Sequence, residues 1–318
     1  MQNEIYILNE IGNRENLEDA ISPVHPGKPP VFVVCDGVGG NNFGEVASQK
    51  AVESFYQTLC SQYINIQHLP SFKKCIGHSL FKFTTVLQDF ITEHPTGKNA
   101  SSTLTALLIK NQSAFLAWCG DSRIYHFRKG EILFRSRDHS LVQDLVDNQL
   151  ITEKEAAHHP QKNVITKSLH QKTDAADIQL HEIKKMEAGD FLLLCTDGLL
   201  EQCTEERLMQ IFKNESAKQT TNYAAVINTI CAGHTQDNYS MMLIRYAGQR
   251  KGRKWIYLLA ILLVSLAAAI LLLPGKPASK KNETPKDTGV SKITADSNTR
   301  RSNFKTGIPD QHTETKQK

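Results

Sequence analysis

The chain is 318 residues long and 40% hydrophobic, which is enough for one large domain with a substantial core. Its formal net charge of +4 is unevenly spread, because residues 246–318 hold fourteen Lys and Arg against five Asp and Glu. The basic excess therefore belongs to the C-terminal part, and the composition gives no case for a nucleic-acid-binding domain.

The start of the chain and the cysteines indicate where the N-terminal part resides. The first residues lack the basic segment and the long apolar segment of a secretory signal. Seven cysteines are scattered without a Cys-x-x-Cys pair, which is typical of buried, reduced thiols in a reducing compartment. Both features predict a cytosolic N-terminal domain.

Up to about residue 246, apolar runs of strand length alternate with runs of helical length. In chain order, strands are predicted at 31–36, 102–110, 113–121, 122–127, 190–197 and 238–246. Helices are predicted at 44–60, 73–92, 140–148, 152–158 and 217–232. Several strands follow one another through tight turns, which indicates antiparallel sheets rather than regular βαβ units.

Residues 255–273 read WIYLLAILLVSLAAAILLL and contain no charged side chain. At roughly 1.5 Å per residue, a helix of this length nearly spans a hydrocarbon core of about 30 Å. Only Ser265 interrupts its apolar surface, so we predict a single transmembrane helix here, preceded by a basic juxtamembrane linker at 247–254. Residues 274–318 contain few large apolar side chains, so we expect a disordered polar and basic tail.

Four aspartates stand at the ends of predicted strands, namely Asp36, Asp121, Asp197 and Asp237. A single aspartate beside a glycine is usually part of a turn and indicates little about function. Four with this placement indicate that the carboxylates meet at one rim of the sheets. Carboxylates that meet raise one another's pKa unless a cation lies among them, and oxygen ligands favour Mg²⁺ or Mn²⁺ over Zn²⁺ or Cu²⁺.

A glycine-rich loop at residues 36–48 follows the first of these strands. It does not match the P-loop, because no Gly-Lys-Ser/Thr ends it. It does not match the dinucleotide-binding fingerprint either, because Asn42 stands at the third glycine position. Asp36 and the carbonyl group of Gly37 are better explained as metal ligands, with the later glycines allowing the backbone to approach closely.

Seven motifs, in order, resemble those of the metal-dependent serine/threonine protein phosphatases of type 2C (the PPM family) in their bacterial form. The resemblance covers about residues 5–246. It rests on RENLEDA (14–20), DGVGGNNFGEVAS (36–48), SSTLTALLI (101–109), GDSRIYHFR (120–128), the segment 138–169, GDFLLLCTDGL (189–199) and DN (237–238). The resemblance implies an α+β fold, a four-layer αββα sandwich in which two antiparallel sheets pack face to face between helices. The catalytic domain would occupy residues 1–246.

The resemblance also implies a set of metal ligands for two Mn²⁺ or Mg²⁺ ions. Asp36 would bridge the ions, Gly37 would bind through its carbonyl oxygen, and Asp197 and Asp237 would complete the set. Asp121 matches the position of a third, weaker metal site in bacterial members of the family.

Three further residues are assigned to catalysis by the same resemblance. Arg14 would bind the substrate phosphate, because a guanidinium fork suits a bidentate phosphate contact. Glu18 and Asp19 would hold water at the metal ions or act close to them. The chain departs from the family pattern at Leu17, where bacterial members usually have asparagine. It also has Val38 where animal members have a histidine that is proposed to protonate the leaving oxygen, so the general acid stays unassigned.

The predicted function is that of a membrane-anchored, Mn²⁺- or Mg²⁺-dependent phosphatase for phosphoserine and phosphothreonine in proteins. A hydroxide that bridges the two ions would attack phosphorus directly. The alternative is a membrane-tethered pseudophosphatase that binds phosphoproteins without turnover. The family implies an opposing Hanks-type Ser/Thr kinase as a partner, and no nucleic acid is expected. The catalytic domain is expected in the cytoplasm, held at the inner membrane by residues 255–273.

Overall fold

The computed structural model describes residues 3–38, 43–213, 221–248 and 262–265. The chain divides into two units, Met1–Gly252 and Arg253–Lys318, and of the second unit only a few helical residues are described. The transmembrane helix predicted at 255–273 and the tail predicted at 274–318 therefore lie almost wholly outside the described residues. Within the described residues, no helix is both long enough and apolar enough to cross a bilayer.

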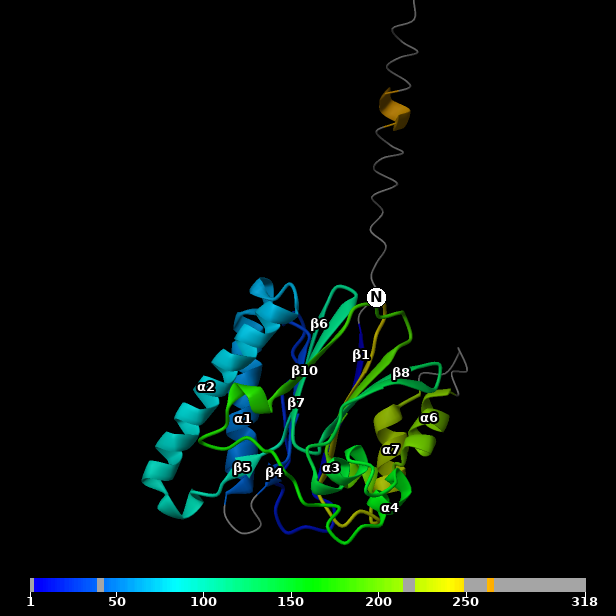
Figure 1. The fold of residues 1–318 in the computed structure, drawn as a ribbon. Helices are drawn as coiled ribbons and strands as arrows, with labels where there is room; N and C mark the ends of the chain where they lie inside the picture. The colour runs from blue at the N-terminus through cyan, green and yellow to red at the C-terminus, as the bar shows by residue number, and fades with distance from the viewer. Residues whose placement is uncertain (1–2, 39–42, 214–220, 249–261, 266–318) are drawn as a thin grey trace, which may run out of the picture. The chain divides into compact units, whose positions relative to one another are not determined.

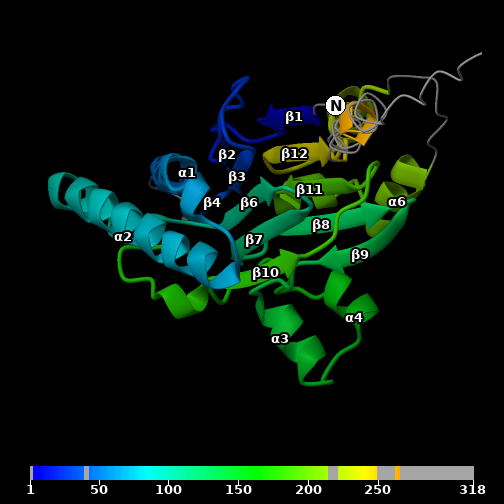
Figure 2. The same ribbon diagram turned by 90° about the horizontal axis from the view of Figure 1, so that it is seen from above.

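The first unit contains two five-stranded sheets in which every pairing is antiparallel (Figures 1 and 2). Sheet A has the order β1 (Glu4–Glu10), β12 (Tyr239–Arg245), β11 (Phe191–Cys195), β8 (Arg123–Arg128) and β9 (Glu131–Arg135). Sheet B has the order β10 (Gln179–Ile183), β7 (Ser113–Cys119), β6 (Leu104–Lys110), β3 (Val31–Cys35) and β2 (Ala20–Ile21). A separate short ladder pairs β4 (Gly37–Val38) with β5 (Ser101–Ser102).

The central strands are apolar along their whole length because both faces of each sheet are covered. All five residues of β3 are buried. Successive side chains of a strand point to opposite faces, so Phe32 and Val34 lie in the core between the two sheets. Val31, Val33 and Cys35 face the other way and pack in the cluster under the helices. Continuous apolar strands of this kind therefore indicate sheets that are buried on both sides.

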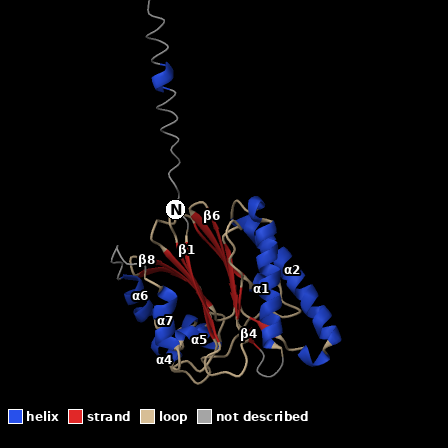
Figure 3. Cartoon of the chain, turned by 180° about the vertical axis from the view of Figure 1, so that it is seen from behind, coloured by secondary structure: helices blue, strands red, loops and turns tan. Residues whose placement is uncertain are grey.

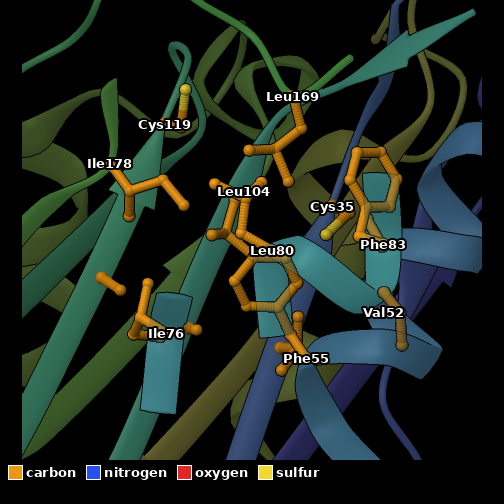
Figure 4. Close-up of a cluster of buried hydrophobic side chains, with 14 of the residues drawn as sticks. Cys35, Val52, Phe55, Ile76, Leu80, Phe83, Leu104, Cys119, Leu169 and Ile178 are labelled. Carbon is orange, nitrogen blue, oxygen red and sulfur yellow. The ribbon is translucent and has the colours of Figure 1, made fainter. Parts of the chain in front are cut away.

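Helices form the two outer layers of the sandwich, as the view from behind shows (Figure 3). The outer face of sheet B is covered by α1 (Gly44–Ser61) and α2 (Leu69–Glu93), whose Phe55, Leu80 and Phe83 pack in the cluster of Figure 4. The outer face of sheet A is covered by α6 (Glu205–Lys213) and α7 (Tyr223–Cys231). These layers confirm the predicted arrangement of two antiparallel sheets with flanking helices.

The remaining short elements lie in the connections between these layers. They are the helices α3 (Leu141–Asp147), α4 (Glu153–Ala157) and α5 (Asp197–Leu200), and the 3₁₀ turns η1 (Tyr63–Asn65), η2 (Pro95–Gly97) and η3 (Ala175–Asp177). Helix α4 begins with a capping box, in which the Thr152 hydroxyl accepts from the backbone N–H of Glu155 and the Glu155 carboxylate accepts from the N–H of Thr152.

Element boundaries differ from the prediction where local chemistry overrides hydrophobic periodicity. Helix α2 begins at Leu69 rather than at residue 73, because His68 and Ser71 form a capping box and proline occupies its first turn. The strand predicted at 102–110 is divided into β5 and β6, because the backbone N–H of Thr103 bonds to the carbonyl of Asp36 and leaves the ladder. The edge strand β1 was not predicted, since only one of its residues is buried.

Candidate active site

Turns at one end of the two sheets carry the four predicted aspartates. Both β3 and β7 pair antiparallel with β6, so their C-termini lie at the same end of sheet B. Asp36 follows β3 and Asp121 follows β7. In sheet A, β11 ends where its antiparallel neighbour β12 begins, and this end of the sheet carries Asp197 and Asp237. Figure 3 shows β4 and α5 at this common end of the sheets. Antiparallel pairing thus brings together residues that are far apart in the sequence.

The carboxylates in this region, buried at Asp19 and Asp121 and half-buried at Asp36, Asp197 and Asp237, affect one another electrostatically. Burial, together with the negative charges of Asp19, Asp197, Asp121 and Asp237, holds the pKa of Asp36 well above its ordinary value. Burial and the charge of Asp197 do the same for Asp121. Burial and the charge of Asp237 raise the pKa of Asp197 to about 6. Such a group of desolvated acids is costly to ionise without a compensating cation.

Two carboxylate oxygens of the group have no hydrogen-bond partner. The Oδ2 atom of Asp19 accepts a hydrogen bond of 2.9 Å from the Thr196 hydroxyl, whereas its buried Oδ1 atom accepts none. The Oδ1 atom of Asp121 is also buried and unpartnered. Burial raises the pKa of Asp19 to about 7. Buried oxygens without partners, in an excess of negative charge, suit a hard divalent cation such as Mg²⁺ or Mn²⁺.

The carboxylates affect one another electrostatically, although their side chains are not arranged as the ligands of a metal ion. Among the described side chains, no group of three or more His, Cys, Asp or Glu residues is close enough together to hold a metal ion. Electrostatic repulsion reaches several ångströms further than a metal–oxygen bond of about 2.0–2.6 Å. The carboxylates can therefore shift one another's pKa while lying too far apart to bind one ion together. The chemistry of the donors fits divalent ions, and the ligand roles of Asp36, Gly37, Asp197, Asp237 and Asp121 stay predictions.

Arg14 lies at the exposed side of this acidic group. Its Nη2 atom donates to the Oδ2 atom of Asp237 at 2.7 Å, and 55% of its side chain is exposed against 32% for the aspartate. Partial burial of the guanidinium lowers its pKa, but Asp237, Glu18 and Asp36 outweigh this effect, so the pKa is raised overall. A charged arginine is thus held beside partly buried acids in a position that solvent can reach.

Glycines allow the backbone segments of the site to approach closely. A Cβ atom added to Gly37 would lie 2.4 Å from the carbonyl group of Gly44, at the start of α1. A Cβ atom added to Gly198 would lie 2.0 Å from the carbonyl oxygen of Asn238. Real Cβ atoms do not approach so closely, so only glycine fits at either position.

Asn238 organises the site in a way that its sequence motif alone did not reveal. Its Oδ1 atom accepts from the backbone N–H of Glu18 at 2.7 Å, and its Nδ2 atom donates to the carbonyls of Ile11 at 2.7 Å and Asn16 at 3.0 Å. One buried amide thus holds the loop at residues 11–19, which carries Arg14, Glu18 and Asp19. The available signal was its place directly after Asp237. A buried asparagine at that place needs several hydrogen-bond partners, which nearby backbone segments would have to supply.

Threonine and serine hydroxyls fix Asp36 in the same way. The Thr103 hydroxyl accepts a 2.9 Å hydrogen bond from the backbone N–H of Asp36, and the Ser102 hydroxyl donates to the Asp36 carbonyl at 2.9 Å. The Thr103 oxygen lies 2.7 Å from the Ser122 oxygen, in the turn that carries Asp121. These contacts join segments distant in the sequence, so hydrophobic periodicity gave no signal for them.

Comparisons with known proteins show which family the chain resembles over this part of its sequence. The family model of protein phosphatase 2C matches residues 9–226. The chain is 28% identical over 222 residues to a putative protein phosphatase 2C-type of Streptococcus pyogenes, covering 69% of this chain and 88% of that protein. It is 29% identical over 214 residues to the protein phosphatase PhpP of Streptococcus pneumoniae, covering 67% and 85%.

Solved structures are similar over the same part of the chain. The serine/threonine phosphatase of S. agalactiae superposes with a TM-score of 0.67 and 28% identity, covering 76% of this chain and 99% of that one. The serine/threonine phosphatase PstP of Mycobacterium tuberculosis superposes with a TM-score of 0.64 and 25% identity, covering 76% and 98%. The family match spans most of the described residues, and the chain therefore belongs to the protein phosphatase 2C family.

Proposed function

We propose that this enzyme hydrolyses phosphoserine and phosphothreonine in proteins with the aid of two Mn²⁺ or Mg²⁺ ions. The observation that carries the proposal is the group of buried and half-buried carboxylates, two of whose oxygens are buried and unpartnered, beside the exposed cation of Arg14. The names of the relatives from M. tuberculosis and S. agalactiae, both serine/threonine phosphatases, support the substrate class. A structure of the PstP catalytic domain contains two manganese ions, which supports the metal requirement.

In this proposal the ions are held by Asp36, Gly37, Asp197 and Asp237, with Asp121 at a third, weaker site. When bound, two such ions supply Lewis acidity and an activated water that attacks phosphorus directly, without a phosphoenzyme. Cations among these carboxylates would offset the repulsion that helps to raise the pKa of Asp36, so bound ions would favour the ionised form of the carboxylates.

The remaining residues bind the phosphate and order water. Arg14 donates to the phosphate oxygens, and its bond to Asp237 keeps the guanidinium beside the metal ligands. Asp19 offers its unpartnered Oδ1 atom as an acceptor for a water, while Thr196 fixes the other oxygen. Glu18 is half-buried and lies close enough to Glu45 and Asp237 for both to raise its pKa. Val38 has no proton to donate, so position 38 supplies no general acid and that role stays unassigned.

We also propose that residues 255–273 anchor the enzyme in the inner membrane, with the catalytic domain in the cytoplasm. The uncharged apolar run supports this anchor, and the division of the chain after Gly252 supports the boundary of the catalytic part. Anchoring raises the effective concentration of the enzyme near membrane-bound phosphoproteins. A membrane-bound Hanks-type kinase is the partner whose products would be the substrates, and residues 274–318 form a tail beyond the anchor.

The test is hydrolysis of p-nitrophenyl phosphate and of a phosphothreonine peptide by the full chain in detergent, with Mn²⁺ and with EDTA. We expect turnover that EDTA abolishes and added Mn²⁺ restores, and loss of turnover in Asp36→Asn. Turnover that persists in EDTA would overturn the metal-dependent reaction. Peptide binding without turnover in the wild type would instead establish a pseudophosphatase.

A further inference from the structure

Two of the seven free cysteines lie against each other in the apolar cluster between sheet A and its covering helices. The Sγ atoms of Cys203 and Cys231 are 3.8 Å apart, and both residues are fully buried. Cys203 follows α5, and Cys231 is the last residue of α7, so the contact joins positions 28 apart in the sequence. The separation of the sulfurs exceeds a disulfide bond length of about 2.05 Å by less than 2 Å, a gap that small side-chain and backbone movements close.

The pair is placed symmetrically with respect to two proposed metal ligands. Cys203 follows Asp197 by six residues, and Cys231 precedes Asp237 by six residues. The backbone N–H of Cys203 bonds to the carbonyl of Leu199 in α5, and the N–H of Thr235 bonds to the carbonyl of Cys231. Each thiol is therefore connected through one short hydrogen-bonded turn to a segment that carries an acidic site residue.

We propose that Cys203 and Cys231 form a reversible intramolecular disulfide when the protein meets a small peroxide. In the first step a Cys203 sulfur electron pair attacks a peroxide oxygen, the O–O bond breaks, and a sulfenic acid and one water form. In the second step the Cys231 sulfur attacks the Cys203 sulfur, the S–O bond breaks, and a second water leaves. Two thiols and one hydrogen peroxide thus give one disulfide and two waters.

The hydrogen bond between the thiols favours Cys203 as the attacking sulfur. The hydrogen bond between the thiols lowers the pKa of Cys203 by more than burial and Cys195 raise it, and the positive charge of Arg207 adds a smaller lowering. The same hydrogen bond raises the pKa of Cys231. The thiolate is the reactive form of cysteine, so Cys203 reacts first and Cys231 resolves the sulfenic acid. Both sulfurs are buried, so a water-sized oxidant reaches them through local opening of the fold.

Cys195 is the competing partner, since it belongs to the same apolar cluster and acts on Cys203 electrostatically. Cys195 is the last residue of strand β11 and is paired in the ladder with Met241 and Arg123, whereas neither Cys203 nor Cys231 belongs to a strand. Approach of two sulfurs needs movement of at least one backbone segment, so the pair outside the ladder is favoured.

Disulfide formation displaces the segments that follow Asp197 and precede Asp237. Misplacement of a catalytic group by about 1 Å can lower turnover by roughly 100-fold, so we expect at least a tenfold reversible loss of activity. This expected loss rests on the proposed function, whereas formation of the disulfide does not. Disulfides in a reducing compartment are characteristically transient and regulatory, which fits a pair that dithiothreitol can reduce again.

The experiment exposes the full chain in detergent to hydrogen peroxide after removal of reductant, and follows intact mass and activity together. We expect a mass loss of about 2 Da that dithiothreitol reverses. Digestion should yield a cross-linked peptide pair, and fragmentation must place the bond at Cys203 rather than at Cys195, which shares its tryptic peptide. Cys203→Ala and Cys231→Ala should each abolish this linkage, whereas the buried control Cys75→Ala should keep it.

The outcomes of this experiment separate the disulfide, its effect on activity and the proposed function. A native protein that shows no mass loss, or one whose bond joins Cys195 to Cys203, overturns the proposal. Reversal by dithiothreitol in the wild type tests it even if a variant fails to fold. A mass loss at the correct pair without loss of activity confirms the disulfide and overturns its effect on the active site. A reduced enzyme without phosphatase activity contradicts the proposed function but leaves the mass test intact.

Discussion

Replacement of Asn238 by alanine would test how the loop that carries Arg14 is held. The substitution removes the three hydrogen bonds that Asn238 makes to the backbone of residues 11–19. Asn238 is 4% exposed, so water does not simply replace its amide. At about 1 kcal/mol for each hydrogen bond, we expect the free energy of unfolding to fall by about 3 kcal/mol.

The larger effect is expected on catalysis, because the same loop carries Glu18 and Asp19. Displacement of these groups by about 1 Å should lower kcat/KM by roughly 100-fold. Urea unfolding and p-nitrophenyl phosphate kinetics measure the two effects separately. The matched control is Asn228→Ala, which removes one hydrogen bond of 2.8 Å from the Tyr239 hydroxyl, away from the acidic group.

The control variant should lose about 1 kcal/mol of stability and keep the wild-type kcat/KM. If Asn238→Ala were as active as the control while losing stability, Asn238 would be an ordinary buried amide and the positioning role would be refuted. If neither stability nor activity changed, the three hydrogen bonds themselves would be in doubt.

Three further substitutions test other parts of the structure. Asp190→Asn removes the carboxylate that Arg128 and His126 bind, and unfolding experiments should show a loss of about 3–5 kcal/mol. The pKa of Asp190 is lowered in the fold, so its contribution to the free energy of unfolding is complete above about pH 3.9 and is lost as the pH falls towards the folded-state pKa. A stability difference between wild type and Asp190→Asn that grew in acid would contradict this pH dependence. Arg14→Ala should lower kcat/KM for the phosphothreonine peptide by about 10–100-fold, and an unchanged value would exclude phosphate binding by Arg14. Gly77→Ala, in the middle of α2 with open space around its Cβ position, should raise the melting temperature by stabilising the fold by about 1 kcal/mol, and a decrease would indicate a contact that the structure lacks.

The sequence revealed the sheets and the aspartates because both leave local patterns. Apolar runs such as residues 31–36 and 190–197 correspond to β3 and β11, and aspartates directly after them are visible without the fold. Partners such as Thr103 and Asn238 were missed, because hydrogen bonds between distant segments exist only once the sheets have formed. The weak edge strands β1, β9 and β10 were missed as well, since their partly exposed side chains give no continuous apolar run.

The departures of the helices have a different physical origin. The start of α2 was missed because a capping box and proline, rather than hydrophobic residues, set it. The helix predicted at 217–232 begins only at Tyr223 and ends at Cys231, because Asn222 caps it by accepting from the backbone N–H of Ala225; residues 217–220 lie outside the described part of the chain. Helix α6 was not predicted, although Leu208, Met209, Ile211 and Phe212 have amphipathic helical spacing, because this pattern spans only five residues of a nine-residue helix.

Binding of Mn²⁺ to the full chain, measured by isothermal titration alongside peptide hydrolysis, tests the central claim most directly. If the buried carboxylates bind two catalytic ions, the wild type should take up two tightly bound Mn²⁺ ions and activity should rise with their occupancy. Asp36→Asn should lose both tight sites and the activity, while circular dichroism shows the fold retained. Equal Mn²⁺ uptake by wild type and Asp36→Asn, or activity that does not follow occupancy, would contradict the account.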